Sequence, residues 1–208
     1  MADSPICKQL MEFINANPVL SSYMTNTNYI PAPDVRLRAI KLVPQPRVLI
    51  FGQDPYPRAE SASGMAFNDL KVKQFFSPSM SPSLRNIYKA LLDFNKIKYK
   101  GVQDFYNKLT RFMEANGFRS VQRWFEQTSQ VGVCWLNTAL TFESKDKTSE
   151  HLKAWAPAIK KYIQLLNLNQ NKLVVVLMGG HAQKLEALFS KYPKDHVKIV
   201  KSSHPAVI

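Results

Sequence analysis

The stretch RVLIFGQDPYP at residues 47–57 contains the clearest signal for the fold of this chain. It opens with a short run of aliphatic and β-branched residues, which is typical of a strand buried on both faces. The run ends abruptly at Gly52, and Asp54 and Pro55 follow in a turn. This pattern predicts a strand of a parallel α/β sheet with functional residues at its carboxyl end, because ligands bind beyond the carboxyl ends of such strands.

Three more short apolar runs have the same character. They lie at residues 131–136, 173–178 and 197–200, and each gives way to Gly, Asn or Ser. Their near-continuous hydrophobicity indicates a sheet that is covered on both faces. The four runs together predict the four strands of one sheet.

Segments with helical periodicity separate the predicted strands. A helix is predicted over residues 83–94, with a serine cap directly after Pro82. Another is predicted over residues 155–166, where Pro157 is tolerable only in the first turn. Strands that alternate with helices predict an α/β fold, and we expect one domain over residues 1–208 with a central four-stranded, mainly parallel sheet flanked by helices. Further helices are expected at residues 104–115, 120–127 and 181–189.

The composition limits the class of protein. The formal net charge of +13 and the pI of about 9.8 predict attraction to polyanions, with nucleic acid first. Cys134 lies in an apolar run and is expected to be a buried free thiol. There is no secretory signal and no apolar run long enough to span a membrane, so we expect an intracellular protein of the cytoplasm or nucleus, depending on the host. His and Cys lack ligand spacing, so neither a metal nor a cofactor is expected.

Polar residues follow each predicted strand. Asp54, Asn137, the Gly179-Gly180 pair and His204 come directly after the four runs or within a few residues of them. Each has an ordinary structural explanation by itself, such as an Asx turn for the aspartate. Because parallel strands end at the same edge of a sheet, all four positions are predicted to converge on one rim.

Five motifs at these positions resemble family 1 uracil-DNA glycosylases, in unbroken order from about residue 29 to the C-terminus. The resemblance implies a monofunctional hydrolase of base excision repair that flips uracil out of single- or double-stranded DNA and hydrolyses its N-glycosidic bond. The motifs are GQDPYP at 52–57, SPSLRNIYKAL at 81–91, WLNTALT at 135–141, LMGGHAQK at 177–184 and SSHPAVI at 202–208.

The resemblance also implies roles for single residues. Asp54 would face the developing oxocarbenium ion and orient the attacking water, while a neutral His204 would hydrogen-bond uracil O2. The Asn137 amide would pair with uracil N3–H and O4, and Tyr56 would exclude the methyl group of thymine. Backbone N–H groups around Gln53 would add donors, and Phe67 would stack on the flipped ring. The residues expected to hold the DNA are Pro82, Ser83, Gly179, Gly180, Ser203 and, as the wedge that fills the gap, Ile208.

The sequence departs from the family pattern mainly at DNA-gripping positions. Pro57 replaces the usual His, as it does in poxvirus relatives, and Gly180 replaces a Ser. Ala206 and Val207 replace the Ser-Pro of the wedge loop. The final helical segment of the family is also expected to be missing after residue 208. These departures predict weaker DNA engagement rather than a lost reaction.

One alternative function stays open, which is a catalytically weak or inactive DNA-binding or replication accessory protein with the same fold. The enzyme is favoured by the joint presence of five residues, since a scaffold has no need of them all: Asp54, Tyr56, Phe67, Asn137 and His204. An acid at position 54 argues against a mismatch-type glycosylase, and no G-x-G-x-x-G follows the first strand as in a dinucleotide-binding protein. The expected partner is uracil-containing DNA, a DNA-mimicking inhibitor protein is a candidate for the basic rim, and we expect a monomer without membrane contact.

Overall fold

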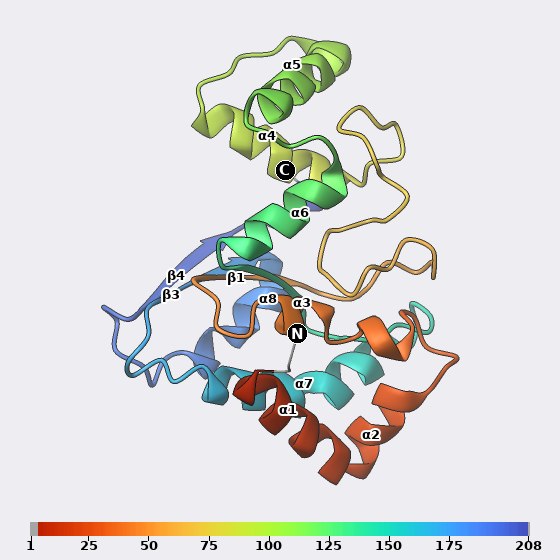
Figure 1. Cartoon of the computed structure of the whole chain (residues 1–208), viewed down its shortest axis with the longest axis vertical. Helices are drawn as coiled ribbons and strands as arrows, with labels where there is room; N and C mark the ends of the chain where they lie inside the picture. Colours follow the sequence, from red (N-terminus) through yellow and green to blue (C-terminus); the bar gives the residue numbers. More distant parts are fainter. Residues whose placement is uncertain (1–3, 208) are drawn as a thin grey trace.

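The computed structural model describes residues 4–207, and its four strands form one parallel sheet in the order β2-β1-β3-β4 (Figure 1). The fold class predicted from the sequence is therefore confirmed, and every neighbouring pair of strands is parallel. Each predicted strand is present to within three residues at either end. The strands are β1 (Val48–Gly52), β2 (Val133–Asn137), β3 (Leu173–Met178) and β4 (Val197–Ser202).

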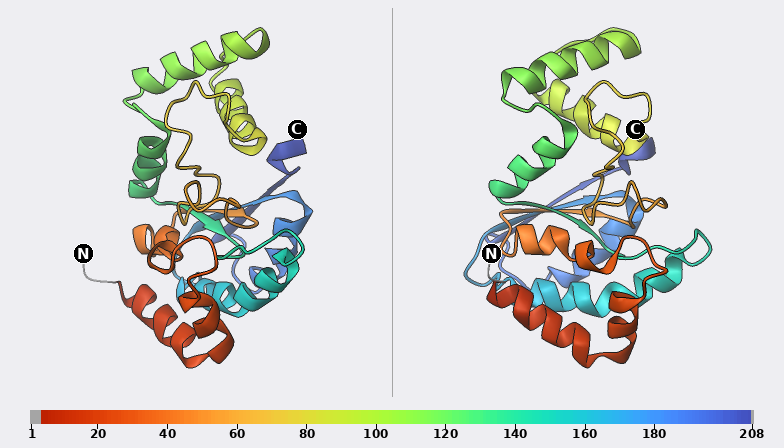
Figure 2. Two further views of the ribbon diagram at one scale, coloured as in Figure 1. Left: turned by 90° about the vertical axis from the view of Figure 1, so that its right-hand side faces the viewer. Right: turned by 45° about the vertical axis from the view of Figure 1, so that its right-hand side comes forward.

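Helices cover both faces of the sheet (Figures 1 and 2). One face carries α4 (Pro82–Phe94), α5 (Gly101–Ala115) and α6 (Val121–Gln130). The long loop between β1 and α4 runs along the same side. The other face carries α1 (Pro5–Ala16), α2 (Pro18–Thr25), α3 (Arg38–Leu42), α7 (Thr148–Leu165), α8 (Gly179–Gln183) and the 3-10 helix η2 (Lys184–Leu188). Two more 3-10 turns are η1 (Pro33–Val35) and η3 (Pro205–Val207).

Side chains alternate between the two layers along each strand. Cys134 points toward α3 and α7, where its thiol donates to the Ala39 carbonyl and contacts Tyr162. The thiol is buried and unpaired, as predicted. Trp135 points to the opposite face and packs against Trp124 and Phe125 of α6. Within residues 4–207, no helix is long and apolar enough to cross a membrane.

The predicted cap of α4 was wrong by two residues. Ser81 is the N-cap, and its hydroxyl accepts a hydrogen bond from the Leu84 N–H. Pro82 occupies the first helical position, where its fixed φ favours a helix and its missing N–H costs nothing. Ser83 therefore lies inside the first turn and does not cap it.

The predicted start of α7 was also wrong. The helix begins at Thr148, so Pro157 lies in its interior rather than in its first turn. The stripe that contains His151, Trp155 and Ile159 is buried against the core over the whole helix. Burying one large apolar side chain contributes roughly 1.5–3 kcal/mol, so several of them outweigh the cost of about 3 kcal/mol for an interior proline.

A buried arginine holds together the loop that follows α2. Arg36 is 1% exposed, and no carboxylate among the described residues forms a salt bridge with it. Burial lowers the pKa of its guanidinium group. Its donors bind five backbone carbonyls at 2.6–2.9 Å, those of Tyr23, Met24, Asn26, Tyr29 and Pro31.

We predict that Arg36→Lys lowers the free energy of unfolding by roughly 3–5 kcal/mol, because an ammonium group cannot reach all five carbonyls and leaves several unsatisfied. Urea denaturation followed by circular dichroism measures the change. Arg111→Lys, at an exposed site on α5, is the matched control and should stay within about 0.5 kcal/mol of the unmodified protein. Equal effects of the two substitutions would contradict this role for Arg36.

Candidate active site

A small cavity of about 200 Å³ opens at the carboxyl edge of the sheet. This volume corresponds to roughly seven water molecules, which is room for one small heterocycle. All six residues predicted to act in catalysis or substrate binding line it. The lining residues are Gly52, Gln53, Asp54, Pro55, Tyr56, Pro57, Phe67, Ser81, Ser83, Asn137 and His204.

The ends of β1 and β2 form the floor of the cavity. Gly52 pairs with Asn137 in the parallel register, and the Thr138 N–H and hydroxyl both donate to the Gly52 carbonyl, at 2.9 and 2.8 Å. A Cβ atom at position 52 would overlap Oδ1 of Asn137 and come within 2.8 Å of the Ala66 side chain. Only glycine therefore allows the Asn137 amide to occupy its place.

The Asn137 side chain is an unused hydrogen-bonding group. It is only 6% exposed and lines the cavity, yet its amide bonds no other described residue. Buried polar groups in native proteins nearly always have a partner, and exceptions call for an explanation. A ligand with a complementary donor and acceptor would supply the missing partners.

A hydroxyl network holds Tyr56 and Phe67 against the cavity. The Tyr56 hydroxyl donates to the Phe67 carbonyl at 3.3 Å and lies 3.0 Å from the Ser81 hydroxyl. Burial raises the pKa of Tyr56, so its hydroxyl stays protonated at neutral pH. Phe67 has a φ of +64°, which is rare for a residue with a side chain, and Trp135 packs edge-on against its ring. The strained backbone and the aromatic neighbour fix the orientation of the Phe67 ring.

A backbone hydrogen bond fixes the tautomer and the orientation of the His204 ring. The Ala206 N–H donates to Nδ1 of His204 at 3.1 Å, so Nδ1 is an acceptor and the proton of the neutral ring lies on Nε2. Gly179, with φ of +87°, lies directly against the ring, and a Cβ there would be 2.8 Å from Cβ of His204. Asn86 of α4 donates to the Pro205 carbonyl at 2.6 Å and ties this loop to α4. The cavity therefore receives an imidazole donor at its rim.

Asp54 is a partly buried carboxylate in the turn after β1. Burial raises its pKa, while a hydrogen bond from Gln53 and the nearby His181 act in the opposite direction. The pKa of His181 is itself lowered, mainly by burial and then by Lys184. Asp54 and His204 line the same cavity, so a carboxyl group and an imidazole donor both face the same small space.

The residues predicted to grip DNA lie around the rim in different settings. Ser83 lines the cavity, and Pro82, Gly180 and Ser203 are exposed beside it. Gly179 is buried against His204, so its observed contact is with the histidine. Ile208 lies outside the described residues. No arrangement of His, Cys, Asp and Glu within residues 4–207 could hold a metal ion.

Sequence reasoning missed three residues that shape the site. Ser81 anchors the Tyr56 hydroxyl, and its position directly before Pro82 is a recognisable capping signal. Gly52 makes room for Asn137, which no local pattern reveals. His181 acts on Asp54 from the start of α8, and only the folded chain brings these two residues close together.

Comparisons with known proteins agree with this geometry. Residues 40–208 match the family model described as the uracil DNA glycosylase superfamily. A uracil-DNA glycosylase from Pseudomonas paraeruginosa is 32% identical over 208 residues, which cover 98% of this chain and 75% of the relative. The crystal structure of UNG from Nitratifractor salsuginis is 28% identical with a TM-score of 0.72, and the match covers 97% of this chain and 82% of that one.

A mimivirus UNG variant, solved in complex with UGI, shares the fold. It is 23% identical with a TM-score of 0.65, over 98% of this chain and 70% of that one. The family model covers far more than half of the sequence, and the Pseudomonas relative is matched over nearly all of it. This chain belongs to the uracil DNA glycosylase superfamily.

Proposed function

We propose that this protein is a uracil-DNA glycosylase whose chemistry takes place in the cavity at the ends of β1 and β2. The observation that carries the proposal is the buried, unpartnered amide of Asn137 in a space for one heterocycle. A base inside a duplex cannot reach such a cavity, so the nucleotide must be flipped out of the stack. The products are free uracil and an abasic site in the DNA.

Asp54 and His204 act at opposite ends of the breaking bond. Cleavage leaves positive charge on the sugar and negative charge on the uracil ring, so the Asp54 carboxylate stabilises the first and orients the attacking water. The Nε2–H of His204 stabilises the developing charge on uracil O2. Because the Ala206 N–H occupies Nδ1, the histidine presents a donor without needing a positive charge.

Two groups reject the wrong pyrimidines. The Asn137 amide accepts from uracil N3–H and donates to O4, whereas cytosine presents the reversed pattern at these positions. Thymine differs from uracil only by a methyl group, which Tyr56 excludes sterically. Ser81 and the Phe67 carbonyl hold the Tyr56 ring in place for this task. Phe67 supplies the stacking surface for the ring.

The DNA backbone would be held at the rim by Pro82, Ser83, Gly180 and Ser203, with Ile208 as the wedge. The net charge of +13 supports binding of either single- or double-stranded DNA. The mimivirus complex with UGI supports an inhibitor protein as a further partner, and we propose the basic rim as its binding site. We also propose a monomer that works in the cytoplasm or nucleus, depending on the host.

An oligonucleotide assay with one U, T or C, followed by alkaline cleavage, tests the activity. We expect cleavage only at U, with a loss of about 10²–10⁴-fold in Asp54→Asn and of about 10²–10³-fold in His204→Leu. Asp93→Asn, at an exposed site on α4, is the matched control and should behave like the unmodified protein. Salt-sensitive DNA binding without any cleavage would instead support the accessory-protein alternative.

The pH dependence follows from the raised pKa of Asp54. The carboxylate is the active form, so uracil release should fall as the pH drops through a pKa that lies above the ordinary aspartate value. Single-turnover rates between about pH 4 and pH 8 measure this limb. The residual activity of Asp54→Asn should lack it, and an unchanged acid limb in that variant would assign the titration to another group.

We predict that Gly52→Ala reduces uracil release at least about 100-fold, because the new methyl group displaces the Asn137 amide from the base. The effect should lie in recognition, so affinity for undamaged DNA should stay within about twofold. Melting temperature and DNA binding are measured beside the rate. Full activity of Gly52→Ala would show that the amide position is not critical.

A further inference from the structure

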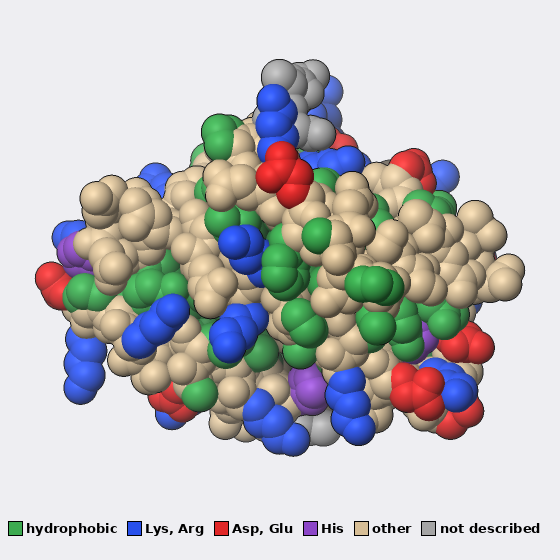
Figure 3. All heavy atoms as spheres, turned by 90° about the horizontal axis from the view of Figure 1, so that it is seen from below, with side chains coloured by type: hydrophobic (Ala, Val, Ile, Leu, Met, Phe, Trp, Pro, Cys, Tyr) green, Lys and Arg blue, Asp and Glu red, His purple; other side chains and the backbone are tan. Residues whose placement is uncertain are grey.

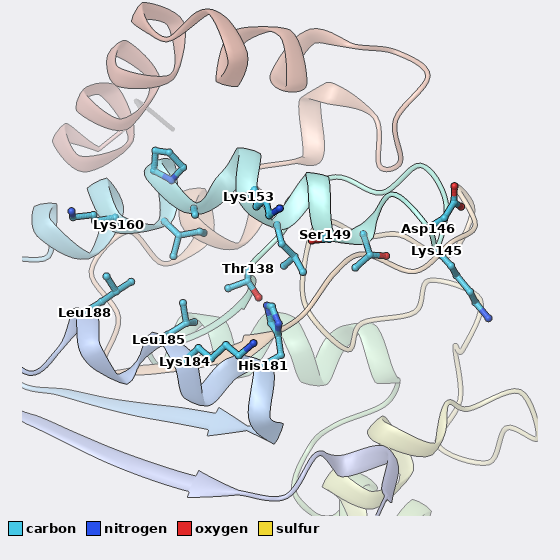
Figure 4. A pocket seen from close by; sticks show the side chains of 15 residues that line it. Thr138, Lys145, Asp146, Ser149, Lys153, Lys160, His181, Lys184, Leu185 and Leu188 are labelled. Atoms are coloured by element: carbon cyan, nitrogen blue, oxygen red, sulfur yellow. The ribbon is translucent and has the colours of Figure 1, made fainter.

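A second, larger cavity lies on the opposite face of the sheet from α4. It is a groove of about 1000 Å³ between α7 and the segment formed by α8 and η2 (Figure 4). Its side chains form an elongated row from Lys160 and Leu188 at one end to Lys145 and Asp146 at the other. The groove and the base cavity share no lining residue, and His181, which lines the groove, lies near Asp54 between the two.

The floor of the groove is aliphatic. Leu152, Ala156 and Pro157 of α7 face Leu185 and Leu188 of η2 across it. Ala156 and Pro157 are exposed, and the three leucines are only partly buried. No Phe, Tyr or Trp lines the groove and His181 supplies its single ring, although single-stranded nucleic acid usually binds by stacking successive bases on several aromatic rings. The floor therefore suits aliphatic side chains better than bases.

The rim of the groove is basic. Lys145, Lys153, Lys160 and Lys184 line it together with a single acid, Asp146. None of these four lysines forms a salt bridge with another residue in the described part of the chain. Seen from below, the end of the molecule that carries α1, α2 and α7 shows apolar side chains gathered over its middle, with basic side chains among them (Figure 3). The rim therefore complements acidic groups.

The dimensions of the groove match a short helix. Its α7 wall runs from Ser149 to Lys160, which at 1.5 Å per residue is roughly 16 Å, or three helical turns. On its other flank α7 packs against α1 and α2, for example through the edge-on contact of His151 with Tyr23. On the groove side that neighbouring position is open, and the α7 surface there is apolar.

We propose that this groove docks an amphipathic helix of a partner protein, with aliphatic residues on one face and Asp or Glu along its edges. An apolar helix face laid into a hydrophobic groove is a common mode of peptide recognition. The lysines would set the orientation and speed up the encounter, and the aliphatic floor would supply most of the affinity.

The test uses the full-length protein and a fluorescein-labelled designed peptide of about fifteen residues, with leucine every three to four positions on one face and glutamate along both edges. A scrambled peptide of the same composition, whose leucines no longer share a face, is the control. Fluorescence anisotropy should show at least about tenfold tighter binding of the designed peptide. Equal binding of the two peptides, or none of either, would overturn the proposal.

Two pairs of variants locate the binding. Lys153→Glu with Lys160→Glu should weaken the peptide at least about tenfold, whereas Lys98→Glu with Lys100→Glu makes the same charge change at the far α4–α5 connection and should have little effect. Ala156→Trp should fill the groove and weaken binding similarly, whereas Ala90→Trp on α4 should not. All six positions are exposed, so the variants should fold.

Two outcomes would contradict the proposal in different ways. Equal weakening by both charge pairs would mean general attraction of an acidic peptide to a basic protein. Displacement of the peptide by an oligothymidylate that loses its own binding in Ala156→Trp would make the groove a path for DNA. None of these measurements uses uracil, so they fail or succeed independently of the glycosylase activity.

Discussion

The pairing of β1 with β2 is the constraint on which the base cavity depends. It places Gly52 beside Asn137, and the two hydrogen bonds from Thr138 to the Gly52 carbonyl lock the ends of the strands together. A slip of one residue would turn Asn137 to the other face of the sheet, because side chains alternate along a strand. The same slip would move Cys134 into the layer of α6 and Trp135 into the layer of α3 and α7, where neither side chain fits its new neighbours, so core packing enforces the position of a polar group.

Helix α4 supports the cavity from the other side. Its capping residue, Ser81, bonds the Tyr56 hydroxyl, and Asn86 one turn later bonds the Pro205 carbonyl. Asn86 and Pro205 are 119 positions apart in the sequence, so this contact joins the beginning and the end of the catalytic region. Helix α4 therefore holds both Tyr56, the residue that would exclude thymine, and the loop that carries His204. The C-terminal turn η3 lies against α4 for the same reason (Figure 2).

The base cavity and the groove beside α7 differ in size and in backbone strain, as expected for a site that binds one base and a site that binds a helix. The base cavity is small and contains the strained positive φ of Phe67 and the Asn137 amide, which bonds no other described residue. Such features persist at functional sites because the surrounding structure holds them. The groove beside α7 is larger, has an aliphatic floor and carries no comparable strain among its described residues. Recognition of a single base requires a few accurately placed hydrogen bonds. A helix can instead be bound through a large apolar contact area and complementary charges.

The sequence alone predicts the four strands, the α/β class and the six catalytic and substrate-binding residues among the eleven that line the base cavity, because short apolar runs and the motifs behind them are local signals. It did not determine the start of α7, since the burial of His151 and Trp155 overrides the local effect of Pro157. The proton position on His204, the spacing role of Gly52 and the groove beside η2 were decided only by the tertiary structure. Each of these depends on a distance between segments far apart in the chain, and such distances exist only after sheet register and helix packing are set.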